Sequence, residues 1–366
     1  MVIMALDHTR DFFANLPDPV DLKVTWPTLF FTRWITHFCA PTFIFLAGVS
    51  AAFQLERGKS RRSLQYLLLT RGAWLLFLEI VVSKFSWSFN FDGHHWFAGV
   101  LWAIGWSMIS LGALLWLPRA VIGFFSVFLI VIHNGWDGIQ AADWGSFSWL
   151  WTLLHAPDML TLAPGITWDI WYPILPWPGV MGLGYVLGKP FFNPEERRSL
   201  ALRLGVAFCF AFIFLRAWNH YGDPNPWQPQ ESGLFTVMSF LNVWKYPPSL
   251  LYLLMTLGPV LILLGTLRDQ LPRFCQPLVV IGRVPMFYYV VHIPLLHLLA
   301  ILAAMLSAQP FLWLFEYPVV NAPKDYGWSL GMVYFFWCLT VLLLYPACRR
   351  FADLKRRSAS PWLSYF

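Results

Sequence analysis

Charged residues are scarce in this chain of 366 amino acids. Asp, Glu, Lys and Arg make up 12% of it, hydrophobic residues make up 58%, and the mean hydropathy is +0.57. Because a soluble domain carries about a quarter charged residues, this composition excludes an ordinary soluble protein. The net charge is +6. The basic residues cluster in short segments between apolar runs, which indicates membrane orientation and excludes nucleic acid as a partner.

Cysteine is also uncommon, and no CxxC pair occurs among the five cysteines. Most of them lie in apolar runs, which excludes a disulfide framework and a cysteine-based zinc site. The sequence has no Asn-x-Ser/Thr sequon and no fixed-period repeat, and its start does not resemble a cleavable signal peptide. His94 and His95 follow Asp92 in a loop, but adjacent side chains do not share a face. We therefore expect no bound metal.

Long apolar runs are abundant. A helix needs about 20 apolar residues to cross roughly 30 Å of hydrocarbon. By this criterion the sequence predicts about ten spans, near residues 1–14, 28–54, 66–86, 97–117, 119–133, 168–188, 199–218, 248–267, 277–306 and 328–348. The first run is too short to cross alone, which predicts either a truncated start or a helix shielded by protein.

The loops between these runs set the orientation. Basic residues gather in the even-numbered gaps and in the C-terminal tail, and this bias places both termini in the cytoplasm. The sequence therefore predicts an all-α, polytopic transmembrane helical bundle. We expect it to form a single domain over residues 1–366.

Two of the predicted outer loops are long, residues 140–167 and 219–246. Loops of this length are usually functional or disordered, and their tryptophan and proline content argues against disorder. The 22 tryptophans of the chain either anchor the membrane interfaces or line a site for an acceptor such as a sugar.

Ionisable side chains inside the first two apolar runs are candidates for function, because such groups are costly at membrane depth. Asp11 follows His8 by three residues. On a helix its carboxylate could orient the imidazole, which can then accept a proton near neutral pH. His37 precedes Pro41 by four residues, which predicts a broken helix that exposes backbone groups to a cavity. Both histidines could instead be structural. His8 could cap a helix end at the membrane interface, and His37 could be a hydrogen-bonded histidine of the core.

The third run contains Arg71 and, eight residues later, Glu79. Arg71 either extends to the inner surface or binds a phosphate, since a guanidinium offers a fixed fork of donors. Glu79 must be protonated, paired or directed into a polar cavity.

The ninth run contains Arg283, Tyr288, His292 and His297. Tyr288 and His292 lie one helical turn apart, and two prolines in this run can distort the helix. These residues form a second candidate cluster.

Gly182, Gly184 and Gly188 resemble a phosphate-binding loop, but no strand is expected before them. Small residues at this spacing allow transmembrane helices to pack closely, and we expect that role here.

Several segments together carry a family resemblance that covers nearly the whole chain in order. They are MVIMALDHTRDFF, THFCAPTFIFLAGVSAAF, LLLTRGAWLLFLEIVV, VLWAIGWSMI, YPILPWPGVMGLGYVLGK, KYPPSLLYLLMTLGPVLILL and GRVPMFYYVVHIPLLH. The chain resembles bacterial membrane proteins related to heparan-alpha-glucosaminide N-acetyltransferase, in a transmembrane acyltransferase superfamily that includes the acyltransferase-3 proteins. His8 matches the catalytic histidine of that family's first span. The aspartate and arginine-glycine pair that usually open this span are absent, which again predicts a truncated start.

The resemblance implies an acyltransferase. It would move an acetyl group from cytosolic acetyl-CoA to an unknown acceptor on the far side of the membrane. On this reading His8 is the general base or a transient acyl carrier, steered by Asp7 or Asp11. His37 and His292 are further catalytic candidates, since His292 matches the family's late histidine.

For the donor, the resemblance implies that Arg71 and Arg283 contact the CoA phosphates, with Tyr288 and Glu79 as further candidates for the CoA site. The expected partners are the lipid bilayer, acyl-CoA and the acceptor. The sequence does not decide whether the protein forms a homo-oligomer. The competing class is a proton-coupled transporter or flippase, which would use the same buried histidines and carboxylates as a relay. Hydrolysis of acetyl-CoA by the purified protein would separate the two.

Overall fold

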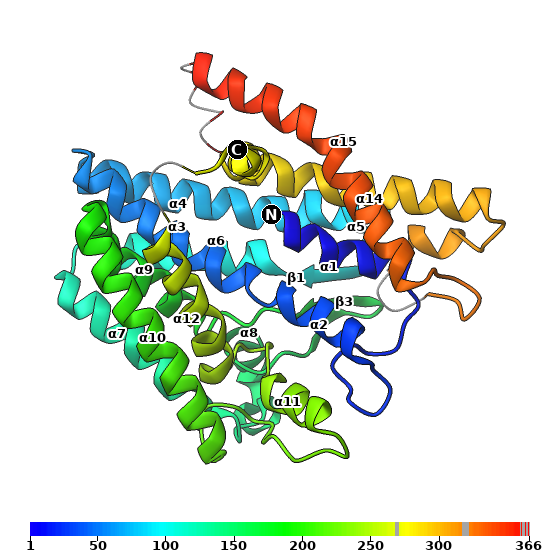
Figure 1. Cartoon of the computed structure of the whole chain (residues 1–366), viewed down its shortest axis with the longest axis horizontal. Helices are drawn as coiled ribbons and strands as arrows, with labels where there is room; N and C mark the ends of the chain where they lie inside the picture. Colours follow the sequence, from blue (N-terminus) through cyan, green and yellow to red (C-terminus); the bar gives the residue numbers. More distant parts are fainter. Residues whose placement is uncertain (268–270, 317–321, 359, 361–362, 364, 366) are drawn as a thin grey trace. The chain divides into compact units, whose positions relative to one another are not determined.

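The computed structural model describes residues 1–267, 271–316, 322–358, 360, 363 and 365 (Figure 1). The chain forms two compact units, and each is built from segments that are distant in sequence. The first contains Met1–Cys39, Ile80–Gly93 and Arg268–Phe366. The second contains Ala40–Glu79 and His94–Leu267.

The first unit is helical. Its elements are α1 (Val2–Phe13), α2 (Pro27–Thr36), α5 (Lys84–Ser88), the 3-10 turn η4 (Arg273–Cys275), α13 (Gln276–Gly282), α14 (Pro285–Leu306), the 3-10 turn η5 (Leu312–Phe315) and α15 (Leu330–Arg357). Helix α1 packs against both α14 and α15, as the first unit in Figure 1 shows. The apolar face of α1 explains this position, since Met4, Leu6, Phe12 and Phe13 are all buried.

The short helix α1 is fixed at both ends by hydrogen bonds. Near its start, the indole N–H of Trp337 donates to the Val2 carbonyl at 2.8 Å. At its end, the Phe12 carbonyl accepts from the Tyr326 hydroxyl at 2.5 Å, and the Phe13 carbonyl accepts from the Trp328 N–H at 2.8 Å. Because the last carbonyls of a helix lack partners within it, these contacts satisfy groups that would otherwise need water. A helix of 12 residues is thereby held inside the protein.

The second unit contains most of the remaining helices and one sheet. Its helices are α3 (Cys39–Glu56), α4 (Arg61–Phe77), the π-helix η1 (Leu78–Ser83), α6 (Val100–Leu114), α7 (Arg119–Ile132), the 3-10 turns η2 (His133–Trp136) and η3 (Ala141–Phe147), α8 (Ser148–Leu154), α9 (Trp177–Phe192), α10 (Pro194–Trp218), α11 (Gly233–Leu241) and α12 (Leu250–Thr266). Cys39, the first residue of α3, belongs to the first unit, and so does η1 from Ile80 onward. η1 continues α4 along the chain into α5.

The sheet corrects the all-α prediction. Three short strands, β1 (His95–Ala98), β2 (Met159–Ala163) and β3 (Ile166–Ile170), pair in the order β1-β3-β2. β1 is parallel to β3, with His95 opposite Thr167, and β2 is antiparallel to β3. The strands lie in or beside segments predicted as loops. Backbone N–H and C=O groups outside helices need other hydrogen-bond partners, and the strands supply them.

Among the described residues, six helices are long and apolar enough to cross a membrane. They are Pro27–Glu56, Arg61–Ser88, Arg119–Trp136, Pro194–Trp218, Pro285–Leu306 and Leu330–Arg357. Three shorter apolar helices are Val100–Leu114, Leu250–Thr266 and Arg273–Gly282. The chain is therefore a multi-pass integral membrane protein.

Several of the predicted spans are not single helices. Residues 166–170 of the expected span 168–188 form β3, and α9 begins only at Trp177. The expected span 277–306 is divided into α13 and α14 at Arg283, because Pro285 lacks an N–H and disfavours the helical conformation of the residue before it. The break predicted near His37 is confirmed, since α2 ends at Thr36 and α3 begins at Cys39.

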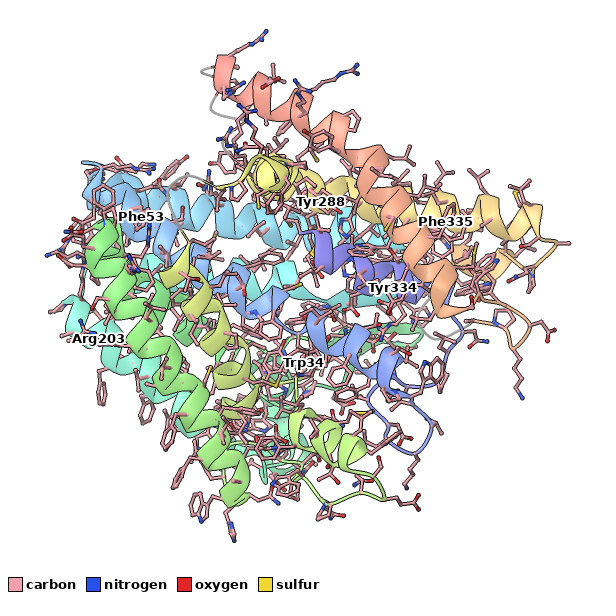
Figure 2. All side chains as sticks on the ribbon, viewed as in Figure 1. Trp34, Phe53, Arg203, Tyr288, Tyr334 and Phe335 are labelled. Carbon is pink, nitrogen blue, oxygen red and sulfur yellow. The ribbon has the colours of Figure 1, made fainter. Side chains whose placement is uncertain are left out.

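The glycines of α9 are packing residues, as predicted. A Cβ atom added at Gly184 would lie 2.1 Å from the Phe45 carbonyl oxygen of α3, and one at Gly188 would lie 2.4 Å from the Ala52 Cβ. On the facing helix, a Cβ at Gly48 would lie 2.0 Å from the Met181 carbonyl oxygen. No side chain larger than hydrogen fits at these positions, so the two backbones touch. Figure 2 labels Phe53, at the C-terminal end of α3.

The two long loops are ordered, as predicted. Residues 140–167 include η3, α8 and β2, and residues 219–246 include α11. The buried guanidinium of Arg216 holds the second loop by donating to the carbonyl oxygens of Asn225, Ser239, Phe240 and Asn242.

Candidate active site

Two histidines from opposite ends of the sequence meet in the first unit. Nδ1 of His8, on α1, lies 2.7 Å from Nε2 of His292, on α14, although 284 residues separate them. The two rings are nearly parallel, with centroids 5.0 Å apart and an interplanar angle of 19°. His292 is fully buried, whereas His8 is half-buried. The structure thus brings together two of the predicted catalytic residues.

The hydrogen bonds of His292 determine which nitrogen carries a proton. Its Nδ1 lies 2.7 Å from the Tyr289 carbonyl oxygen and 3.0 Å from that of Tyr288. Carbonyl oxygens only accept, so Nδ1 carries the hydrogen, and in the neutral ring Nε2 holds the lone pair. His8 therefore donates through Nδ1–H to His292. Its own lone pair is then on Nε2, the nitrogen that can act as a base.

Aromatic side chains surround the pair. Trp87, on α5, lies edge-on to His8 with centroids 5.2 Å apart. Tyr288, labelled on α14 in Figure 2, stacks on His292 at 5.4 Å and is fully buried. Among the described residues its hydroxyl has no hydrogen-bond partner. The pair thus has apolar walls and one buried polar group that protein atoms do not satisfy.

The charged residues of α1 form a balanced group. Asp7 pairs with Arg33 of α2 and lies 3.3 Å from Arg10, which also pairs with Asp11 at 2.7 Å. Two carboxylates thus offset two guanidinium groups in a partly buried position. The described contacts of Asp11 are with Arg10. The expectation that Asp11 orients the His8 ring is therefore wrong in this structure, because the ion pair takes the carboxylate and His292 bonds the ring.

The remaining histidines of this unit differ in their surroundings. His37 is buried in the turn between α2 and α3, and its catalytic role stays a prediction. His297 donates from Nδ1 to the Ser86 carbonyl at 3.1 Å, and its ring stacks on Phe12 and on Phe89. These contacts are those of a core histidine.

Glu79, a residue of η1 in the second unit, contacts the N-terminal end of α6. It is 1% exposed, and its Oε1 accepts a hydrogen bond from the Gly99 N–H at 2.7 Å. The first N–H groups of a helix lack partners within it and attract negative charge. The other oxygen, Oε2, has no hydrogen-bond partner among the described residues, so the structure shows a backbone contact and does not decide among the three expected outcomes. A role in the CoA site stays a prediction.

In the same unit Lys59, which lies between α3 and α4, neighbours Arg71 of α4. Lys59 donates to Gln54 Oε1 at 2.9 Å, and burial, followed by the charge of Arg71, lowers the pKa of the Lys59 ammonium. Two neighbouring positive charges of this kind favour the binding of an anion between or beside them. Arg283, in the first unit, is exposed at the C-terminal end of α13.

Sequence reasoning missed two residues of these sites. Lys59 could have been found, because it lies in the basic segment Arg57–Arg62 that precedes Arg71. Trp87 gave no signal, since it is one of 22 tryptophans and its neighbour His8 is far away in sequence.

The fold and the histidine pair define a multi-pass helical membrane protein in which two histidines from distant helices are in contact. The family model described as heparan-alpha-glucosaminide N-acetyltransferase, catalytic, matches residues 1–215, and the chain belongs to this family. Membership makes the protein a membrane acetyltransferase, and it does not favour the transporter alternative. A comparison with curated proteins gives no match.

Proposed function

We propose that the protein transfers an acetyl group from cytosolic acetyl-CoA to a sugar acceptor on the other side of the membrane, with His8 as the reacting base or acyl carrier. The contact between His8 and His292 is the observation that carries this proposal. His8 is also the residue that matches the family's catalytic histidine.

The tautomers derived above give each histidine a role. In one route His8 Nε2 takes the proton from the acceptor amine or hydroxyl, which attacks the thioester carbon of acetyl-CoA and expels the CoA thiolate. In the other route Nε2 itself attacks that carbon, the carbon–sulfur bond breaks, and the thiolate leaves before the acetyl group passes to the acceptor. In either case His8 becomes positively charged, and its Nδ1–H donates more strongly to His292 Nε2. His292 is held by the Tyr288 and Tyr289 carbonyls, so it orients His8 as the third member of a catalytic triad orients its base.

Acetyl-CoA would supply an activated thioester as the acyl donor. Lys59 and Arg71 suit its phosphates, because they are neighbouring cations and a guanidinium binds phosphate oxygens in a fixed geometry. Arg283 is an exposed cation that can also bind a CoA phosphate. On the predicted topology these basic groups belong to the cytoplasmic side, where CoA is found.

The orientation follows from the loops. We propose about ten membrane crossings, some made by helices shorter than 18 residues, with both termini in the cytoplasm of a bacterial inner membrane. The bias of lysine and arginine toward the even-numbered gaps supports this arrangement. The family's description names a glucosaminide, and the tryptophan-rich outer loops suit a sugar ring, which supports a sugar acceptor.

The experiment uses purified protein in detergent and acetyl-CoA labelled in the acetyl group. Without acceptor, the wild type should release CoA slowly or become acetylated, and acetylated protein would identify the acyl carrier. His8→Ala should do neither. The matched control is His297→Gln, a buried histidine on the same helix as His292 that should keep activity. Failure of the wild type to release CoA or bind the label would contradict the proposal.

A further inference from the structure

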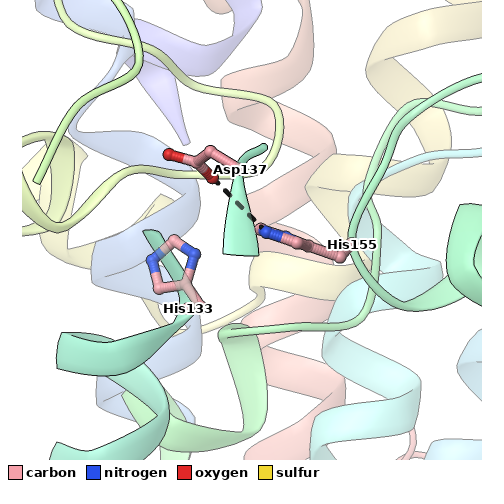
Figure 3. Close-up of side chains that lie close together, drawn as sticks. All are labelled: His133, Asp137 and His155. Carbon is pink, nitrogen blue, oxygen red and sulfur yellow. Dashed lines mark ion pairs between the residues drawn. The ribbon is translucent and has the colours of Figure 1, made fainter. Parts of the chain in front are cut away.

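Three side chains capable of binding a metal converge in the second unit, where α7 ends (Figure 3). His133 lies in η2, Asp137 follows η2, and His155 follows α8. One donor atom from each lies within 4.8 Å of the others, and His155 Nε2 is 3.4 Å from Asp137 Oδ1. The His133 and His155 side chains are buried, at 0% and 3% exposure. The residues span 22 positions of a segment predicted to be partly loop, so the sequence did not reveal the cluster.

The two buried imidazoles lack hydrogen bonds. Among the described residues, neither ring nitrogen of His133 or of His155 has a hydrogen-bond partner. Buried polar groups are nearly always satisfied, so two adjacent unsatisfied rings need an explanation. A metal ion that accepts a lone pair from each ring provides it, whereas hydrogen bonds between the side chains do not.

The carboxylate is held in position by neighbouring groups. Asn134 donates from Nδ2 to Asp137 Oδ2 at 2.8 Å, and its own Oδ1 accepts from the Leu250 N–H at 2.8 Å. With Oδ2 fixed in this way, Oδ1 is the oxygen that faces His155. Hydrogen bonds to the outer oxygen of a ligating carboxylate are typical of metal sites, because they fix its orientation.

The His155 ring is also held from the side. Trp151 packs edge-on against it with centroids 5.0 Å apart, and the Trp151 indole N–H donates to the Ile139 carbonyl at 2.9 Å. The ring of His133 lies edge-on to that of His155 at 5.6 Å. Both imidazoles therefore belong to a packed region that a bound ion would tie together.

We propose that His133, Asp137 and His155 bind Zn²⁺, with a water or another oxygen ligand as the fourth donor. Two imidazoles and one carboxylate suit zinc, whereas calcium and magnesium prefer oxygen. Zinc bonds of about 2.0–2.1 Å place the ligands of a tetrahedron roughly 3.3 Å apart. The His155–Asp137 separation of 3.4 Å already fits, and the His133 donor atom lies within 4.8 Å of the other two.

The ion would join the end of α7 to the end of α8 and so fix the segment between residues 133 and 155. It is independent of the histidine pair on α1 and α14. Zinc binding can therefore be measured without an assay of acetyl transfer. The proposal departs from the expectation of no bound metal at this one site.

The test uses wild-type protein purified with a tag that contains no histidine, dialysed first against zinc and then against metal-free buffer. Mass spectrometry of the metal content should give about one zinc per chain. The double variant His133→Gln/His155→Gln should lose it, and the exposed control His220→Gln should keep it. Wild type that retains no zinc, or a double variant that retains as much as wild type, overturns the proposal.

A second measurement needs no variant. X-ray absorption at the zinc edge of the loaded wild type should show nitrogen and oxygen ligands at about 2.0–2.1 Å, with the outer-shell signal of imidazole. A sulfur shell, or a spectrum without imidazole, overturns the assignment. Zinc should also raise the unfolding temperature of the wild type, because a ligand that binds the folded state stabilises it. An equal rise in the double variant would place the ion elsewhere.

Discussion

Replacement of the two paired histidines should give very different losses of activity. His8→Ala removes the group that moves the proton or carries the acetyl group. General acid–base catalysis contributes about 10²–10⁴-fold, or roughly 3–5 kcal/mol, and the loss should fall in this range or beyond. CoA binding should persist, because the affinity for CoA rests on contacts elsewhere.

His292 acts on the reaction through one hydrogen bond, 2.7 Å long, which becomes charge-assisted when His8 gains a positive charge. A hydrogen bond to a charged group is worth about 1.5–3 kcal/mol, so His292→Ala should slow the reaction roughly 10- to 100-fold through this contact. His292→Gln leaves a carbonyl that can accept from His8 Nδ1–H, and it should keep more activity than His292→Ala. The expected order of activity is therefore wild type, His292→Gln, His292→Ala and His8→Ala.

The assay measures acetyl transfer at matched protein concentration, with CoA affinity determined separately by calorimetry. Size-exclusion chromatography confirms that each variant is folded, which matters for His292 because it is fully buried. The reasoning fails if His8→Ala retains activity near wild type while His37→Ala or His292→Ala has none. Equal loss in His292→Gln and His8→Ala would also refute it, because His292 would then be more than an orienting residue.

Three further predictions concern CoA, stability and topology. Arg71→Ala and Arg283→Ala should each weaken CoA binding by about 1.5–3 kcal/mol, as measured by calorimetry, and unchanged affinity in both would remove them from the site. Glu79→Ala should lower the free energy of unfolding by about 1–3 kcal/mol, because it leaves the buried start of α6 without an acceptor. Thermal unfolding in detergent measures this, and Glu79→Gln, which keeps an acceptor, should lose less. A cysteine at Arg62 should be labelled only from the cytoplasm and one at Ala142 only from outside, whereas labelling of both from one side contradicts the topology.

Much of the helical architecture could be predicted from the sequence, because long apolar runs and proline positions act locally. The break after Thr36 and the glycine contacts of α9 are two such features. The sheet could not be predicted. Its strands are short, and β1 pairs with β3 across some 70 residues, so each strand depends on a partner that local patterns do not identify.

The candidate site was predictable as a list of residues but not as an arrangement. His8 and His292 were both expected, since ionisable groups in apolar runs are rare. Their contact was not expected, because a carboxylate three residues away gave His8 a nearer partner. That carboxylate is instead paired with Arg10. Spacing along a helix indicates which groups can meet, but competing charges decide which ones do.

The pairing of α1 with α14 also has a consequence for how the protein is made. His8 leaves the ribosome before His292, which is translated 284 residues later. His292 also lies beyond residues 1–215, the part of the chain that the family model matches. In a nascent chain, His8 therefore has no contact with His292 until α14 has been inserted. The histidine pair can therefore form only late in synthesis, and the proposed catalytic centre is completed only once α14 is in place.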